Sequence, residues 1–373
     1  MVAALTLATQ LGGGGLLLSL APEDAERIRS DQWHLSYLNV AVAHQHSQGD
    51  GVIVAVPDTG VDPHPDLRNN LLAGIDLVNR GSGDGRHDPH SHGTAMAGII
   101  GAHGRPNRLG ALGIAPRAKI LPIRTSDATN ESEADRLAAG IEYAVSYGAD
   151  IISISGGGAT SSRLSRAIRI AQTANVVIVA AAGNRPTDQG VIFPASAEGV
   201  IAVGGTDHIG NYASIAVAGP QIDVVAPAVD VYTTSIEGKY RRSTGTSNST
   251  AIVAGMAALV RARYPHLTAE QVGKRLTSTA IDKGPPGRDD QYGYGVIDIV
   301  AALTADLPPL GFEATTPDGS PPSPGSSQSQ SKNESAATTR GLVTLGVIVV
   351  AGAAWAIARG RRRSDDPPPR ISR

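Results

Sequence analysis

The sequence predicts an α/β fold in which a mostly parallel sheet lies between two layers of helices, followed by one C-terminal transmembrane helix. Three observations support this prediction. Short apolar runs typical of buried strands alternate with helical segments between about residues 50 and 304. A polar segment rich in Pro and Ser follows, and after it an uncharged apolar run ends at a cluster of arginines. Alternating strands and helices favour a parallel sheet covered on both faces.

The individual elements follow from the apolar patterns. Thr268 with Gln271 three residues later matches a capping box, which indicates a helix start. In folds of this class, ligand sites lie at the carboxyl ends of the strands. We expect strands at 51–57, 120–124, 150–155, 176–183, 200–205 and 223–227, and helices at 92–101, 134–147, 164–174, 246–264 and 268–280.

Composition limits the class of protein. The 373 residues can form one large catalytic domain with appendages. Cys is absent, which excludes disulfides, thiolate zinc sites and a Cys nucleophile. The formal net charge of -2 gives no reason to propose nucleic acid as a partner. Aromatic residues make up only 3%, so small aliphatic side chains must pack the core.

We divide the chain into five regions. Residues 1–47 form an N-terminal extension, and its apolar Gly-rich start resembles the apolar part of a signal peptide but lacks a preceding Lys or Arg. It is either a targeting segment or a frayed or misassigned start. A catalytic domain (48–305), a Pro/Ser-rich linker (306–340), a transmembrane helix (341–358) and a basic cytoplasmic tail (359–373) are expected to follow.

The membrane prediction rests on length and charge. The 18 uncharged residues of 341–358 would form a helix about 27 Å long, which just spans a hydrocarbon core of roughly 30 Å. Arg359 and Arg361 to Arg363 follow directly, and clustered arginines favour the cytoplasmic side. We therefore expect a single-pass protein of the cell membrane with an extracytoplasmic catalytic domain. The alternative is a buried core helix.

Three polar residues stand at element ends. Asp58 ends a predicted buried strand, and His92 and Ser247 each open a helix of small residues. A serine hydroxyl is a weak nucleophile that needs an imidazole to take its proton, and the imidazole needs an orienting carboxylate. A serine at a helix start also gains from the positive end of the helix dipole. Asn184, just after another strand, could donate its amide to the oxyanion of a tetrahedral intermediate.

These motifs carry a resemblance to a known family. The segments DTGVD, HGTxxAG, SGGG, AAAGN, FPAS and GTS occur in the order seen in subtilisins, the serine protease family S8, over roughly residues 51–302. Each motif alone is weak, but the ordered set is specific. The resemblance implies Asp58 as orienting carboxylate, His92 as general base and acid, Ser247 as nucleophile and Asn184 as oxyanion donor.

The resemblance also implies a substrate site and a setting. Ser155, Gly156 and Gly157 would pair with an extended peptide or protein substrate, and Ala182 and Gly183 would help to form the S1 pocket. The QWHL entry segment, the Pro-rich linker, the apolar helix and the basic tail are similar to the mycosins, membrane-anchored subtilases of type VII secretion. Membrane components of such a secretion complex are the implied partners.

Four positions depart from the family pattern. Proline at Pro57 is awkward inside a central strand because it cannot donate a hydrogen bond. Ala95 replaces a second His, Ala251 replaces a Pro after the nucleophile, and Gly156 replaces a larger residue. Mycosins usually carry disulfides, which this chain cannot form. None of these changes removes a catalytic group.

No metal or cofactor is predicted. The histidines between 87 and 92 form a local cluster, but the sequence shows no further ligand, so we interpret them as a polar loop with one catalytic His. Asp62 and Asp66, near His64, could form a calcium site or a solvated turn, and the turn is the preferred interpretation.

The sequence therefore predicts a membrane-anchored serine endopeptidase that hydrolyses peptide bonds through an acyl-enzyme. The alternative is a structural subunit of a membrane secretion complex whose protease activity is dispensable or lost. The intact set of four catalytic residue types favours the enzyme.

Overall fold

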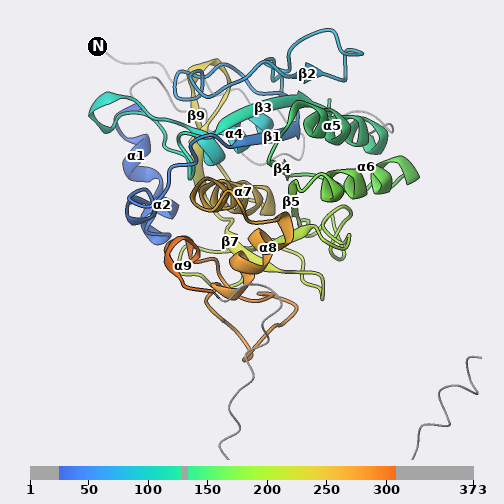
Figure 1. The fold of residues 1–373 in the computed structure, drawn as a ribbon. Coiled ribbons are helices and arrows are strands. Elements are labelled where there is room, and N and C mark those ends of the chain that lie inside the picture. The colour runs from blue at the N-terminus through green and yellow to red at the C-terminus, as the bar shows by residue number, and fades with distance from the viewer. Residues whose placement is uncertain (1–24, 128–132, 308–373) are drawn as a thin grey trace, which may run out of the picture. The chain divides into compact units, whose positions relative to one another are not determined.

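A computed structural model describes residues 25–127 and 133–307, which Figure 1 draws in colour. All of them belong to one compact unit, residues 1–312. Within the described residues, seven parallel strands form one sheet in the order β2-β3-β1-β4-β5-β6-β7, and β8 and β9 form an antiparallel hairpin. The strands are β1 Ile53–Asp58, β2 Ile75–Asp76, β3 Lys119–Arg124, β4 Ile151–Ile154, β5 Val177–Ala181, β6 Ile201–Thr206, β7 Val224–Pro227, β8 Val231–Thr234 and β9 Tyr240–Ser243.

Helices cover both faces of the sheet, as the α/β prediction requires (Figure 1). Successive side chains of a strand point to opposite faces. Val54 and Val56 of β1 pack with the helices of one face, whereas Ala55 packs with those of the other. The first face holds α4 His92–Gly101, α7 Thr246–Arg263, α8 Ala269–Ser278 and α9 Ile299–Thr304, and the second holds α5 Glu133–Tyr147 and α6 Ser162–Thr173.

The predicted strands and the five predicted helices are confirmed, with end shifts of a few residues. The capping box of α8 is present, because Thr268 and Gln271 exchange both hydrogen bonds. The sequence patterns missed β2, the β8–β9 hairpin, α9 and three short helices near the N-terminus, all too short to show a period. Those three helices are α1 Ile28–Asp31, α2 Trp33–Tyr37 and α3 Val40–Ala43.

The three short helices belong to the same core as the sheet. Ile28, Leu35 and Val40 are buried in the cluster that also contains residues of α4 and α7. The Gln32 amide donates to the Leu112 carbonyl at 2.9 Å and accepts from the Leu112 backbone N–H at 2.8 Å. The described part of the N-terminal extension is therefore packed on the same face of the sheet as α4 and α7.

The remaining regional predictions concern residues that the structure does not describe. They are the signal-like start before residue 25, nearly all of the linker, the 341–358 helix and the basic tail. Within residues 25–127 and 133–307, no helix has the length and apolar character needed to cross a bilayer.

Pro57 fits its central strand because of the direction in which its nitrogen faces. Along β1, the backbone groups of alternate residues face alternate neighbours. Val52 and Asp58 accept bonds from the β3 side, and Ile53 accepts one from Asp150, on the β4 side. Pro57 therefore faces β4, but the pairing with β4 covers only Val54 and Ala55. The missing N–H of Pro57 therefore falls just beyond the residues of β1 that pair with β4.

The β8–β9 hairpin is held against α4 by two threonine hydroxyls. Thr234 Oγ1 donates to the Thr94 carbonyl at 2.7 Å, and Thr233 Oγ1 donates to the Ala95 carbonyl at 3.0 Å. Gly98 allows this approach, since a Cβ there would lie 2.0 Å from Thr234 Oγ1. β9 is thereby placed beside the start of α4.

His34 makes the stability of this fold sensitive to pH. It is fully buried, and neither ring nitrogen has a hydrogen-bond partner among the described residues. Burial lowers the pKa of His34 from 6.5 to about 3. Between these values the unfolded chain binds a proton that the folded chain does not, so stability falls as the pH is lowered, by about 1.4 kcal/mol per pH unit at most.

We expect His34→Leu to weaken the loss of stability between pH 6.5 and 3, because leucine has no proton to bind. Urea unfolding at stepped pH measures the slope. Burial also lowers the pKa of His44 and His64, so the slope should shrink rather than vanish. His46→Leu, at an exposed position, should retain the wild-type slope. Equal slopes for wild type and His34→Leu would refute the assignment.

Candidate active site

The predicted site residues lie at one edge of the sheet. Asp58 ends β1, the Ser155 segment follows β4, and Asn184 follows β5 by three residues; these three strands are neighbours. The helices α4 and α7 begin at His92 and at Thr246, directly before Ser247. After β1 the chain forms β2 and β3 on one side of that strand and then crosses to β4 on the other side. Open α/β sheets place their ligands at such a switch in strand order.

Asp58 and His92 form a close pair. His92 Nδ1 lies 2.7 Å from Asp58 Oδ1 and 2.9 Å from Oδ2. The carboxylate is 6% exposed and the imidazole 37% exposed. The Thr59 backbone N–H also donates to Asp58 Oδ1, at 2.7 Å. Because Nδ1 is engaged by the carboxylate, Nε2 remains as the ring nitrogen that can accept a proton.

The pKa of His92 is raised above its ordinary value of 6.5. Burial by the surrounding protein lowers this pKa, but the charge of Asp58 and its hydrogen bond to the ring outweigh that effect. Among more distant groups, Arg241 lowers the pKa and Asp88 raises it. The imidazolium that forms when His92 takes a proton is thus stabilised mainly by Asp58.

Asp88 joins the end of β1 to the start of α4. Its Oδ1 accepts from Thr59 Oγ1 at 2.8 Å and from the backbone N–H groups of His90 and Ser91 at 2.9 Å. Its Oδ2 accepts from the Thr94 N–H at 2.9 Å and from Thr94 Oγ1 at 2.6 Å. Asp88 is 3% exposed. A buried carboxylate at the positive end of α4 is favourable. Asp88 also connects the strand end that carries Asp58 to the helix start that carries His92.

Ser247 is half-buried in the first turn of α7. Its Oγ donates to the Ser155 carbonyl at 2.8 Å. Among the hydrogen bonds of the described residues, none joins Ser247 to His92. Catalytic hydrogen bonds are often long or poorly aligned without substrate. A rotation of the Ser247 side chain about its Cα–Cβ bond frees the hydroxyl from Ser155.

Asn184 is bound to the same helix start. Its Oδ1 accepts from the Thr246 N–H at 2.9 Å and from Thr246 Oγ1 at 3.3 Å. Its own backbone N–H donates to Asp188 Oδ2 at 2.7 Å. With the amide oxygen engaged, the side-chain NH₂ is the part of Asn184 left to donate. The residue before Ser247 thus orients the amide donor.

The predicted substrate edge is exposed beside the Asp58–His92 pair. Gly156 and Gly157 are exposed, and a Cβ on Gly157 would lie 2.2 Å from the Phe193 carbonyl, so that position needs glycine. A pocket joins this edge to the Asp58–His92 pair, and its lining includes Asp58, His92, Gly156 and, as apolar walls, Ala134, Leu137 and Ile154.

Ala182 and Gly183 are more enclosed than the edge segment. The Ala182 side chain is fully buried in a small apolar cluster. Gly183 has a φ of 116°, and a Cβ there would lie 2.9 Å from an Asp188 carboxylate oxygen. A side chain at Gly183 would therefore strain the turn that leads to Asn184. Their part in an S1 pocket stays a prediction.

The unusual residues after Ser247 have structural partners. Asn248, which is buried, donates through Nδ2 to the carbonyls of Ala228 and Ser243 and accepts from Ser243 Oγ at 2.9 Å. It connects α7 to Ala228, before the hairpin, and to Ser243, the last residue of β9. Ala251 is fully buried inside α7, which runs on to Arg263. Sequence reasoning identified Ala251 as a departure and missed the bonds that Asn248 makes.

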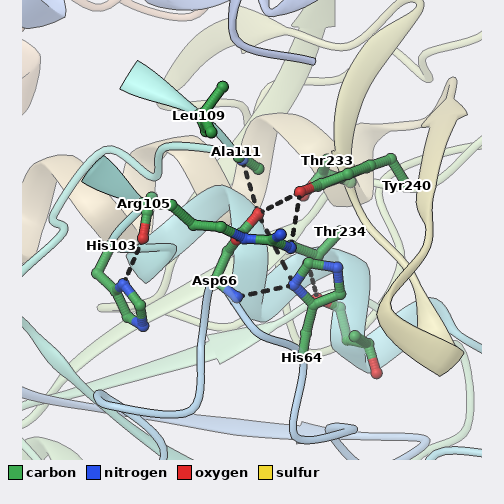
Figure 2. Close-up of polar contacts among 12 residues, drawn as sticks. His64, Asp66, His103, Arg105, Leu109, Ala111, Thr233, Thr234 and Tyr240 are labelled. Carbon is green, nitrogen blue, oxygen red and sulfur yellow. Dashed lines mark hydrogen bonds and ion pairs between the residues drawn. The ribbon is translucent and has the colours of Figure 1, made fainter. Parts of the chain in front are cut away.

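The prediction of a solvated turn at Asp66 is wrong. Asp66 is fully buried, and Figure 2 shows the side chains that converge on it. Arg105 Nε donates to Oδ1 at 2.6 Å, while the Ala111 N–H and Tyr240 OH donate to Oδ2 at 2.7 and 2.8 Å. His64 Nδ1 accepts from the Asp66 N–H at 3.0 Å. Arg105 and Tyr240 lie far from Asp66 in the sequence, so the local pattern could not show that they bind this carboxylate inside the protein.

The calcium alternative is tested by the same contacts. Both Asp66 oxygens are engaged by protein donors, and Asp62 Oδ2 accepts from the Glu237 N–H at 3.0 Å. Within the residues that the structure describes, no three His, Asp or Glu side chains are grouped so that they could hold a metal ion.

The similarity to known proteins shows that the fold is that of a subtilisin-type serine protease. The chain belongs to the subtilase family, whose family model matches residues 49–295. It is 39% identical over 267 residues to a thermostable alkaline protease of Halalkalibacterium halodurans, covering 71% of each chain. It is 37% identical over 267 residues to subtilisin DY of Bacillus licheniformis, covering 70% of this chain and 94% of the relative.

Two solved structures are similar to the protein. One is MycP1, a serine protease described as an essential component of the type VII (ESX-1) secretion system, with 30% identity and a TM-score of 0.67 over 77% of this chain and 92% of MycP1. The other is the MycP3 protease of the type VII (ESX-3) system, with 34% identity and a TM-score of 0.65 over 74% of this chain and 88% of MycP3. The predicted resemblance to subtilisins and mycosins is confirmed.

The raised pKa of His92 predicts the acid side of the pH profile. A protonated His92 cannot take a proton from a nucleophile, so activity should fall as the pH drops through the pKa of His92. We expect the acidic limb of kcat/KM to have its midpoint above 6.5, the ordinary histidine value. Because the fold also weakens below pH 6.5, samples held at pH 6 should be assayed again at pH 8. A reversible midpoint below 6.5 would contradict this electrostatic account.

Proposed function

We propose that the chain is a serine endopeptidase in which Asp58, His92 and Ser247 form the catalytic triad and Asn184 supports the oxyanion. The observation that carries the proposal is the Asp58–His92 pair, joined at 2.7 and 2.9 Å. A buried carboxylate on one ring nitrogen leaves the other as a base, at the sheet edge where α7 presents Ser247. A scaffold has no physical need for that arrangement.

The proposed reaction has two halves. Ser247 Oγ attacks the scissile carbonyl carbon while His92 Nε2 takes the hydroxyl proton, and Asp58 stabilises the imidazolium. The Asn184 amide donates to the oxyanion. The C–N bond then breaks, His92 returns the proton to the leaving amine, and an acyl-enzyme remains. Water, deprotonated by His92, releases the acid and restores Ser247.

The proposed substrate is an extended peptide or protein that pairs with Ser155, Gly156 and Gly157 as an added strand. The exposure of Gly156 and Gly157 supports this pairing. The Ser155 carbonyl now accepts from Ser247, so a peptide N–H that bound this carbonyl would release the nucleophile. Ala182 and Gly183 are proposed to lie beside the first residue before the scissile bond.

We also propose a role in type VII secretion, at the cell membrane. The likeness to MycP1 and MycP3 supports the link, and the apolar run 341–358 with its arginine cluster supports an anchor. The domain plan is then a catalytic domain at 48–305, a linker at 306–340, a membrane helix at 341–358 and a cytoplasmic tail at 359–373. The rival role is a structural subunit of the secretion complex whose catalysis is dispensable.

Labelling with a fluorophosphonate probe tests the triad. Wild type should label, and Ser247→Ala should lose both labelling and peptide cleavage because its nucleophile is gone. Asp58→Asn should reduce turnover strongly, since it leaves His92 in the wrong tautomer. Asn184→Ala should lower kcat by about 10²–10³, the effect known for removal of an oxyanion donor, with little change in KM.

Ser249→Ala is the matched control, because Ser249 Oγ is buried and bonded to the Ala226 carbonyl. It removes a hydroxyl from the same helix and should still label. Wild type that stays unlabelled from pH 7 to 9 would overturn the triad and leave the structural subunit as the remaining role.

Protease shaving of intact cells tests the topology. External protease should remove the catalytic domain and leave a small C-terminal fragment in the membrane, because the arginine cluster is expected inside. A tag placed after Arg373 should be protected, whereas a tag in the 306–340 linker should be lost. Cleavage of the C-terminal tag in unbroken cells would rule out the proposed orientation.

A further inference from the structure

We infer that Arg241 is a positioning residue for the general base. It holds Ser91, the residue before His92, and its positive charge acts on the Asp58–His92 pair. The inference rests on the proposed triad and extends it to a residue 150 positions from Ser91 in the sequence. No motif pointed to it.

The first support is the contact with Ser91. Arg241 Nη1 donates to Ser91 Oγ at 2.7 Å. Ser91 is the N-cap of α4, but its hydroxyl makes no capping hydrogen bond, because Asp88 does the capping instead. The Ser91 side chain is therefore available to Arg241, and it connects the β8–β9 hairpin directly to the start of α4.

The second support is backbone strain. Ser91 has φ 62° and ψ -1°, a left-handed conformation that is unfavourable for a residue other than glycine. Such a conformation persists only where neighbouring groups hold it. Asp88 binds the Ser91 N–H and Arg241 binds the Ser91 hydroxyl. The angle at which the chain enters α4, and with it the placement of His92, depends on both contacts.

The third support is the charge of Arg241. The guanidinium is half-buried, its Nε is buried without a hydrogen-bond partner, and no ion pair within 4.0 Å involves it among the described residues. The charged groups that act on His92 are Asp58 at the end of β1, Asp88 before α4 and Arg241 on β9. The two carboxylates raise the pKa of His92, and Arg241 lowers it.

A purely structural arginine and a positioning arginine predict different pH profiles. Arg241→Met removes the charge and the Ser91 contact, so the acidic limb of kcat/KM should move to higher pH, with a larger loss of activity at pH 6 than at pH 9. Arg241→Lys retains the charge but not the guanidinium geometry. Ser91→Ala retains the charge and removes the contact. Both should lower kcat and leave the limb where it is in wild type.

Arg242→Met is the matched control. Arg242 is the exposed neighbour that pairs with Asp230 at 3.5 Å, so its loss makes the same change in net charge away from His92. The acidic limb of kcat/KM should not move in Arg242→Met. An equal shift in Arg242→Met would show a general charge effect and overturn the proposal. An acidic limb that stays in place in folded Arg241→Met would also overturn it. If Arg241→Met does not fold, as judged by circular dichroism, Arg241→Gln replaces it with the same criterion.

An NMR titration separates this proposal from the proposed function. The His92 ring signal, followed in Ser247→Ala, reports protonation without requiring activity. Adding Arg241→Met to that background should move the His92 midpoint to higher pH, and adding Arg242→Met should not. A shift in an enzyme that never labels would support the role of Arg241 in setting the His92 charge while rejecting catalysis. No shift in an enzyme that labels would reject Arg241 alone.

Discussion

The geometry of the site depends on the hydrogen bonds that the buried carboxylate of Asp88 accepts. Catalytic groups on a strand end and on a helix start must be held together by something that binds both. Asp88 does so with five accepted hydrogen bonds, one from Thr59 directly after Asp58 and two from Thr94 directly after His92 and Gly93. Its charge is matched by the positive end of α4, so the residue caps the helix and connects the layers at once.

Much of the fold and the proposed triad could be predicted because each depends on local patterns. Buried strands are continuous apolar runs, and a polar residue directly after such a run falls at the ligand edge. Asp58 and Asn184 were found in this way, whereas the Ser155 segment was implied by the resemblance to subtilisins. Helix starts at His92 and Ser247 followed from runs of small residues. The matching of all these motifs to one family supplied their proposed roles.

The rest could not be predicted because it depends on pairs that are distant in sequence. Asp66 looked like a solvated turn because its local sequence is polar, while the residues that bury and bind it, Arg105 and Tyr240, come from other loops. In the sequence, Arg241 is simply one of two adjacent arginines. Only the β8–β9 hairpin, too short to show a period, brings it to Ser91 and leaves Arg242 outside.

The charges around His92 illustrate why a catalytic pair needs more than its two members. A general base works best when its pKa is near the working pH. Asp58 alone would favour the imidazolium, and the nearby charge of Asp88 acts in the same direction. Burial and Arg241 act in the opposite direction. The carboxylate that fixes the geometry of α4 therefore also makes His92 harder to deprotonate, and a cation on the facing hairpin offsets that effect without touching the ring. Positioning and electrostatic tuning at this site are two results of one set of contacts.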